Sequence, residues 1–275
     1  MDALSPTRRV LVLAPHPDDE IVACGIAARR SRANGARLFV LYLTTGVPPR
    51  EALWPWQRGA YDERVERRRH EALAASSLIG LAPAGLLDVP SRQLVAHLDE
   101  AAAAIDRALG ETSADCLWVT AFEGAHQDHD AANALAARFR ERVPVWEFAA
   151  YNYAGRKVRS NRFIDARGGV IELRLNRDEA ALKRRALALY ASERGNLAHI
   201  SIAEEAYRPL PRHDYAASPH SGKLFRERFQ WVPFRHPRVD FAPSAKIYAA
   251  LGQWSSTRAA VHGAQGIDIA PAAEG

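Results

Sequence analysis

Residues 10–28 read VLVLAPHPDDEIVACGIAA, which is an apolar run, a polar turn and a second apolar run. The first run is typical of a buried β-strand, and the second is typical of the start of a buried helix. His16 and the three carboxylates at residues 18–20 therefore lie on a strand-to-helix turn, where ligand sites form in open α/β sheets. Core packing does not require one imidazole and three carboxylates on a turn. A divalent metal site with a general base does require such residues.

A second stretch, residues 116–140, repeats this order of features and reads CLWVTAFEGAHQDHDAANALAARFR. An apolar strand leads into a polar turn and then into a helix. If both strands belong to one parallel sheet, both turns open on the same edge of that sheet. His16, Asp19 and His129 can then converge on one ion, and two imidazoles with one carboxylate are a common catalytic zinc set.

Both stretches resemble signature segments of the PIG-L/LmbE family of metal-dependent N-acetylglucosaminyl deacetylases. That family carries an H-P-D-D-E segment near the N-terminus and an H-x-D-H segment later, which stand here at residues 16–20 and 126–129. Two weaker features of the family are also matched. One is Thr-Thr-Gly at residues 44–46, and the other is an R-x-x-E helix pattern at residues 68–71. The resemblance extends over residues 8–235.

The resemblance implies a metal site and its chemistry. His16, Asp19 and His129 would bind Zn2+, and Asp18 would be the general base for the metal-activated water that attacks the amide. An amide is a poor electrophile and water a poor nucleophile, but bound zinc lowers the pKa of its water from about 15.7 to about 7 and polarises a carbonyl oxygen. Because Asp18 lies between His16 and Asp19 in the sequence, it can reach that water without being a ligand.

The resemblance also implies roles for the second turn. His126 would assist the oxyanion of the tetrahedral intermediate, and Asp128 would hold His126 in its working protonation state. Because His126 and His129 are three residues apart, both can face one pocket from a helical turn.

Three further residues are candidates for substrate binding. The resemblance suggests Arg68, which belongs to the helix segment matched above. Tyr215 and His220 lie in a C-terminal stretch similar to a signature of some bacterial members, so both are expected to line the pocket.

The chain departs from the family pattern at three positions. Gln127 replaces the usual proline of the second motif, and Gly124 stands where some relatives place a tyrosine near the oxyanion. Ser91 stands where many members have an aspartate near the sugar. These differences leave the metal chemistry unchanged and bear on the substrate.

We therefore predict a metal-dependent N-deacetylase, an amidohydrolase acting on linear amides, whose substrate is a small N-acylated amino sugar such as N-acetylglucosamine or its conjugate. Two alternatives stay open. The same two-histidine, one-aspartate set suits a non-haem Fe(II) enzyme with Fe2+ in place of Zn2+, and the scaffold could be a non-catalytic glycan-binding module. The aglycone, the acyl group and the oligomeric state are not specified by the sequence.

Composition narrows the class of protein. The chain has 275 residues, of which 48% are hydrophobic, enough for the core of one large α/β domain. Cys24 and Cys116 each lie in an apolar segment, so we expect no disulfide framework and a reducing compartment. No apolar run approaches the length of a membrane span, and the N-terminus lacks the apolar core of a signal peptide. We therefore predict a cytoplasmic protein.

The net charge of +5 does not indicate nucleic-acid binding. The chain has only four lysines, so its positive charge comes from arginine. The densest charged run, residues 64–71, mixes both signs at helical spacing and is typical of a solvated helix face. No recognised nucleic-acid motif occurs.

Apolar periodicity predicts alternating strands and helices in the first part of the chain. Strands are expected at residues 9–14, 37–43, 85–89, 115–120 and 144–149, and helices at residues 19–33, 61–78, 94–109 and 130–141. This alternation predicts an α/β fold with a Rossmann-like, mostly parallel sheet flanked by helices. No glycine-rich dinucleotide fingerprint follows the first strand, so nucleotide binding is not expected.

The pattern changes after residue 150. A β-hairpin is expected between residues 162–165 and 170–175, because Arg167-Gly168-Gly169 lies between them. A helix at residues 178–192 would follow, and then an ordered loop-rich segment at residues 195–245 over the sheet edge.

These observations predict a single PIG-L/LmbE-like domain at residues 1–262. Its sheet core would span about residues 8–150, with a hairpin and loop cap at about residues 151–262. The small residues of the tail, 263–275, predict a mobile segment.

Overall fold

The computed structural model describes residues 8–264 of the chain, so the predicted tail lies outside the described residues from residue 265 onward. In these residues the main sheet has seven strands in the order β3-β2-β1-β4-β5-β9-β8. They are β1 (Arg9–Ala14), β2 (Arg37–Tyr42), β3 (Ala82–Leu86), β4 (Cys116–Thr120), β5 (Val145–Phe148), β8 (Ile171–Arg174) and β9 (Glu204–Pro209). A separate pair joins β6 (Tyr151–Asn152) to β7 (Arg159–Ser160).

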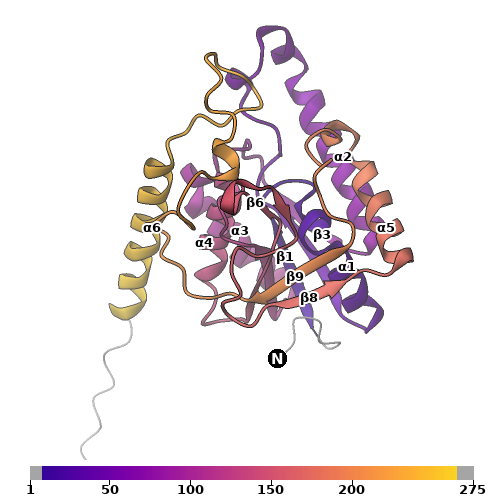
Figure 1. Cartoon of the computed structure of the whole chain (residues 1–275). Helices are drawn as coiled ribbons and strands as arrows, with labels where there is room; N and C mark the ends of the chain where they lie inside the picture. Colours follow the sequence, from indigo (N-terminus) through magenta and orange to yellow (C-terminus); the bar gives the residue numbers. More distant parts are fainter. Residues whose placement is uncertain (1–7, 265–275) are drawn as a thin grey trace, which may run out of the picture.

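The sheet is parallel from β3 to β5, and β9 then pairs antiparallel with both β5 and β8. The described helices are α1 (Asp19–Ala33), α2 (Tyr61–Ile79), α3 (Leu98–Thr112), α4 (Gln127–Ala137), α5 (Arg177–Leu189) and α6 (Ser244–Ala264). Helices α1, α2 and α5 cover one face of the sheet, and α3, α4 and α6 cover the other (Figure 1). The predicted α/β fold with a mostly parallel, helix-flanked sheet is confirmed.

The apolar run of β1 explains its central place. Val10 and Val12 pack under α1, whereas Leu11 and Leu13 pack under α3 and α4, and all four are buried. A strand that is buried on both faces has no polar positions to alternate with apolar ones, as is usual in parallel sheets. Among the described residues, no helix is both long and apolar enough to cross a bilayer.

The C-terminal part of the sheet differs from the prediction. Residues 171–174 pair with β9, and the hairpin of this region is formed instead by β6 and β7. Residues 162–165 form no strand; Phe163 among them packs on small residues at the sheet edge. A four-residue alternation shows which face is apolar but not which strand lies alongside, so the non-local partner β9 was missed.

Other elements also differ. Strand β3 spans Ala82–Leu86, so it begins and ends three residues before the predicted strand, and α6 was not predicted. Helix α4 begins at Gln127 rather than near residue 130, so Asp128 and His129 lie in its first turn.

Helix α1 is interrupted at Cys24, whose φ is −144°. The amides of Ile26 and Ala27, which follow the break, donate to the carboxylate of Glu205 on β9 at 3.0 and 2.8 Å. Lys183 on α5 donates to Glu205 Oε1 at 2.9 Å and to the carbonyl oxygen of Val22 at 3.1 Å. Both charged side chains are fully buried. This ion pair replaces the helix hydrogen bonds lost at the break and ties α1 to β9 and α5.

We expect Lys183→Met to destabilise the protein by about 3–5 kcal/mol, because it leaves the Glu205 carboxylate buried without its cation. Urea unfolding would measure the change in the free energy of unfolding. The matched control is Arg142→Met, which removes an exposed partner of Asp106 and should cost less than about 1 kcal/mol. Equal effects of the two substitutions would contradict a special role for the buried pair.

Candidate active site

The two sequence motifs meet because β1 and β4 are neighbours in the sheet. The chain leaves β1 toward β2 on one side and leaves β4 toward β5 on the other. The connecting turns therefore diverge and open a crevice at the carboxyl ends of these strands, which is the usual ligand position in an open α/β sheet. Helices α1 and α4 both begin at this crevice.

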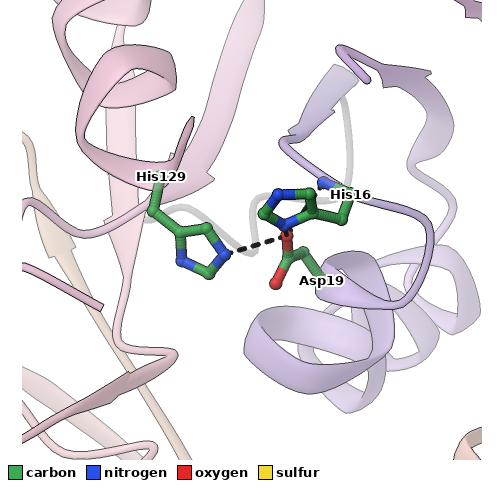
Figure 2. A group of neighbouring side chains, drawn as sticks. All are labelled: His16, Asp19 and His129. Carbon is green, nitrogen blue, oxygen red and sulfur yellow. Dashed lines mark hydrogen bonds and ion pairs between the residues drawn. The ribbon is translucent and has the colours of Figure 1, made fainter. Parts of the chain in front are cut away.

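His16, Asp19 and His129 converge there as the sequence predicts. Asp19 Oδ2 lies 3.0 Å from His16 Nδ1 and 3.1 Å from His129 Nε2. Figure 2 shows the two rings directed at the same carboxylate, His129 from α4 and Asp19 from the start of α1. One atom from each residue lies within 4.8 Å of the others, and all three residues are buried.

The residues fit a divalent cation. The His129 ring is fully buried; its Nε2 lies 3.1 Å from Asp19 without hydrogen-bond geometry, and its Nδ1 has no hydrogen-bond partner among the described residues. A buried polar atom without a partner is costly, and a metal ion bound to one ring nitrogen would remove part of that cost. Burial disfavours charge on His16, but hydrogen bonds and charges of Asp128 and Asp19 raise its pKa to about 10, so the cluster favours a cation. Imidazole and carboxylate ligands suit zinc and Fe(II).

Asp128 orients His16 more directly than it orients His126. Its Oδ2 lies 3.0 Å from His16 Nε2 and 3.5 Å from His126 Nδ1. The backbone amides of Arg92 and Leu94 also donate to this carboxylate, at 2.6 and 3.2 Å. A carboxylate that accepts from the second nitrogen of a ligand histidine fixes the ring and its tautomer. The resemblance predicted that Asp128 holds His126. In the structure Asp128 lies closer to His16 than to His126.

His126 is the N-cap of α4. Its Nδ1 accepts a hydrogen bond from the amide of Asp128 at 3.1 Å, so in a neutral ring the proton resides on Nε2. Burial lowers the pKa of His126 well below its usual value and keeps the ring neutral. The ring lies against His16, with centroids 4.5 Å apart, and its side chain retains 18% exposure. His126 can therefore donate a hydrogen bond to a molecule in the crevice.

Asp18 lies beside the cluster in a strained turn. Its φ is 125°, which is unusual for a residue with a side chain. Arg68 Nη2 donates to Asp18 Oδ2 at 2.9 Å and also contacts the carbonyl oxygen of Pro17. Gly46 permits this contact, since a Cβ there would lie 2.9 Å from Pro17 Cδ and 3.0 Å from Arg68 Nη2. Burial raises the pKa of Asp18 to about 7, although the Arg68 charge acts in the opposite direction.

The three predicted substrate residues are placed differently. Arg68 is only 3% exposed and its guanidinium bonds Asp18, so it positions the acid rather than facing the crevice. The Tyr215 hydroxyl donates to Asn133 Oδ1 at 2.7 Å within the core, and His220 bonds the carbonyl oxygen of Ser221. Neither Tyr215 nor His220 contacts His16, Asp19 or His129. The structure therefore does not place these two residues at the candidate metal site.

Sequence reasoning missed Tyr151, whose ring centroid lies 5.3 Å from that of His129. Tyr151 follows β5, the strand next to β4. Residues that follow neighbouring parallel strands meet at the same edge of the sheet, and this rule could have located Tyr151 as it located the two motifs. At Gly124, φ is +67° and a Cβ would lie 2.6 Å from Leu224 Cδ2. A side chain there would strain the backbone and require Leu224 to move, which favours glycine at this position.

Residues 11–139, which contain both motifs, match the sequence model of a known family, described as PIG-L, GlcNAc-PI de-N-acetylase. This segment is therefore similar to the PIG-L family. A comparison of the whole chain with curated proteins found no significant match.

Several solved structures resemble the fold of this chain. A pseudoaglycone deacetylase of an antimicrobial compound is 19% identical with a TM-score of 0.59, covering 74% of this chain and 97% of that chain. The zinc-inhibited form of a teicoplanin deacetylase is 19% identical with a TM-score of 0.56, covering 73% and 97%. An N,N'-diacetylchitobiose deacetylase from Pyrococcus horikoshii is 15% identical with a TM-score of 0.51, covering 78% and 88%. At these identities the likeness establishes the fold.

We expect the purified protein to bind one equivalent of Zn2+ and His129→Gln to weaken that binding by at least about 10-fold. Equilibrium dialysis with metal analysis would measure the affinity. Binding should also weaken progressively as the pH is lowered, because protons compete with the metal for the imidazoles and the pKa of His16 is raised.

His220→Gln is the matched control for this measurement, because His220 lies outside the cluster and should leave zinc affinity unchanged. The assignment would fail if His129→Gln bound zinc as tightly as the unaltered protein.

Proposed function

We propose that this protein is a metal-dependent hydrolase that removes an acetyl group from the nitrogen of an amino sugar or its conjugate. The observation that carries the proposal is the convergence of His16, Asp19 and His129 beside Asp18, inside the PIG-L segment. The structural relatives described above are named deacetylases, which supports the same reaction class.

Zinc is the proposed metal. Bound to these ligands, a zinc ion would lower the pKa of a water molecule to about 7 and polarise a carbonyl oxygen. One relative was solved in a zinc-inhibited form, so zinc acts on that protein. Fe2+ fits the same ligands and belongs in the same assay.

Asp18 is the proposed general base. Its raised pKa of about 7 allows the carboxylate to take a proton from the attacking water near neutral pH and to return it to the leaving amine. Arg68 holds the carboxylate in place through its 2.9 Å hydrogen bond.

His126 is the proposed oxyanion donor. Its neutral ring can direct Nε2–H at the amide oxygen as negative charge develops there. Asp128 contributes by fixing His16 and the start of α4, through the contacts described above.

The function is tested by amine release from N-acetylglucosamine, its methyl glycoside and N,N'-diacetylchitobiose. Asp18→Asn should lower kcat by about 10²- to 10⁴-fold with zinc content unchanged, because the amide cannot accept the proton. The control is Asp62→Asn, which alters an exposed carboxylate paired with Arg50 and should leave kcat unchanged.

Equal rates for Asp18→Asn and the unaltered protein would exclude Asp18 as the base. Sugar binding by the unaltered protein without any amine release would favour a glycan-binding module instead.

The pH profile tests the link between Arg68 and Asp18. Because the base works in its ionised form, activity should rise with pH through the pKa of Asp18. Arg68→Met removes the charge that lowers this pKa, so the acidic limb of kcat/KM should move to higher pH by about one unit. A bound metal would shift the acidic limb of kcat/KM to lower pH in both proteins. The limb of Arg68→Met would still lie at higher pH than that of the unaltered protein.

Arg69→Met is the control for that profile, since Arg69 is the exposed neighbour of Arg68 on α2. An unmoved limb in Arg68→Met would show that its guanidinium does not act on the catalytic acid.

A further inference from the structure

Side chains from the C-terminal half of the chain pack beside His129, one of the candidate metal ligands. Tyr151 packs with its ring centroid 5.3 Å from that of His129, 4.5 Å from that of Phe225 and 5.1 Å from that of His199. The guanidinium carbon of Arg228 lies 3.3 Å from the Phe225 ring centroid. We call Tyr151, His199, Phe225 and Arg228 the C-terminal wall.

The polar groups of this wall lack protein partners. In the described part of the chain, the Tyr151 hydroxyl makes no hydrogen bond, and the buried His199 Nε2 has no partner. Arg228 donates only through Nε, to the carbonyl oxygen of Phe225 at 3.0 Å, so its terminal nitrogens remain available. Leaving the buried His199 Nε2 unpaired is costly, and a ligand with hydroxyl groups could pair with all three side chains.

The protonation states suit a neutral polyhydroxylated ligand. A tyrosine phenol carries its proton at neutral pH, so Tyr151 can donate a hydrogen bond. Burial lowers the pKa of His199 to about 4, so its imidazole is neutral at pH 7. The wall therefore offers a phenol, a neutral imidazole and a guanidinium around two aromatic rings.

The position of the wall links it to the reaction. The ring of Tyr151 contacts the ring of His129, one of the three residues proposed to hold the metal. A saturated ring whose acylamino substituent reaches the metal cluster would lie with its own hydroxyls against Tyr151. Aromatic side chains pack against the apolar face of a saturated sugar ring. The polar groups at the ends of the wall's side chains can then form hydrogen bonds with the sugar hydroxyls.

We infer that the C-terminal wall is the subsite for the pyranose ring that bears the acylamino group. The inference rests on the proposed function, since it places the sugar of that same substrate. It assigns Tyr151, His199 and Arg228 to recognition of the sugar hydroxyls, and none of them to the metal or to proton transfer.

Binding is tested with methyl glucosaminide, the amine product, because the enzyme does not consume it. Calorimetry on the zinc-loaded protein should show an affinity loss of about 3- to 10-fold for Tyr151→Phe and at least about 10-fold for Arg228→Met. Tyr215→Phe, the control, removes a buried hydroxyl outside the wall and should leave the affinity unchanged. Zinc content and thermal unfolding would verify that each variant is folded and loaded.

Kinetics give a second readout. The wall should make KM for the methyl glycoside of N-acetylglucosamine lower than KM for N-cyclohexylacetamide, which has the same ring size without hydroxyls. Tyr151→Phe should narrow this difference while kcat changes less. A difference in KM that Tyr151→Phe and Arg228→Met both leave intact would overturn the assignment.

The outcomes separate the two proposals. Equal affinity for methyl glucosaminide in all variants overturns the subsite, whether or not the protein releases amine. Amine release from N-cyclohexylacetamide without any sugar binding also overturns it and leaves the hydrolase standing. Sugar binding that depends on Tyr151 and Arg228 without amine release supports the subsite and removes the proposed function.

Discussion

The parallel pairing of β1 with β4 is the constraint on which the candidate site depends. Their connections diverge to opposite sides, so the two polar turns face each other across one crevice. Each turn opens a helix, and the first turns of α1 and α4 carry Asp19 and His129 toward a common point. No local feature of either motif could bring these two side chains to 3.1 Å.

Gathering acids and imidazoles in a buried crevice costs desolvation energy, and the fold offsets that cost with specific partners. Arg68 neutralises Asp18, and backbone amides of residues 92 and 94 satisfy Asp128. The same principle operates below the site, where Lys183 and Glu205 bridge the break in α1. The nitrogens of His129 form no hydrogen bond among the described residues, although Nε2 lies close to Asp19. These nitrogens mark the position where a metal ion fits.

Much of the first half of the fold could be predicted, because its strands are continuous apolar runs bounded by clear turns. The strand at residues 9–14 and the helix at residues 19–33 were located correctly, and so was the meeting of the two motifs. The second half was harder, since β8 has only four residues and its pairing with β9 spans a whole helix. Arg68 illustrates the same limit within the site, because its burial against Asp18 follows from how α2 packs and not from its own segment.

The sequence by itself determined the chemistry that is available: the residue types of the two motifs, their places at strand ends, and the α/β class. Those follow from local periodicity and from the short reach of a turn. Only the tertiary structure decided that Asp128 lies closer to His16 than to His126, that Tyr215 belongs to the core, and that Tyr151 stands beside the metal ligands. Such contacts join segments far apart in the chain, so they depend on strand order and packing rather than on neighbouring residues.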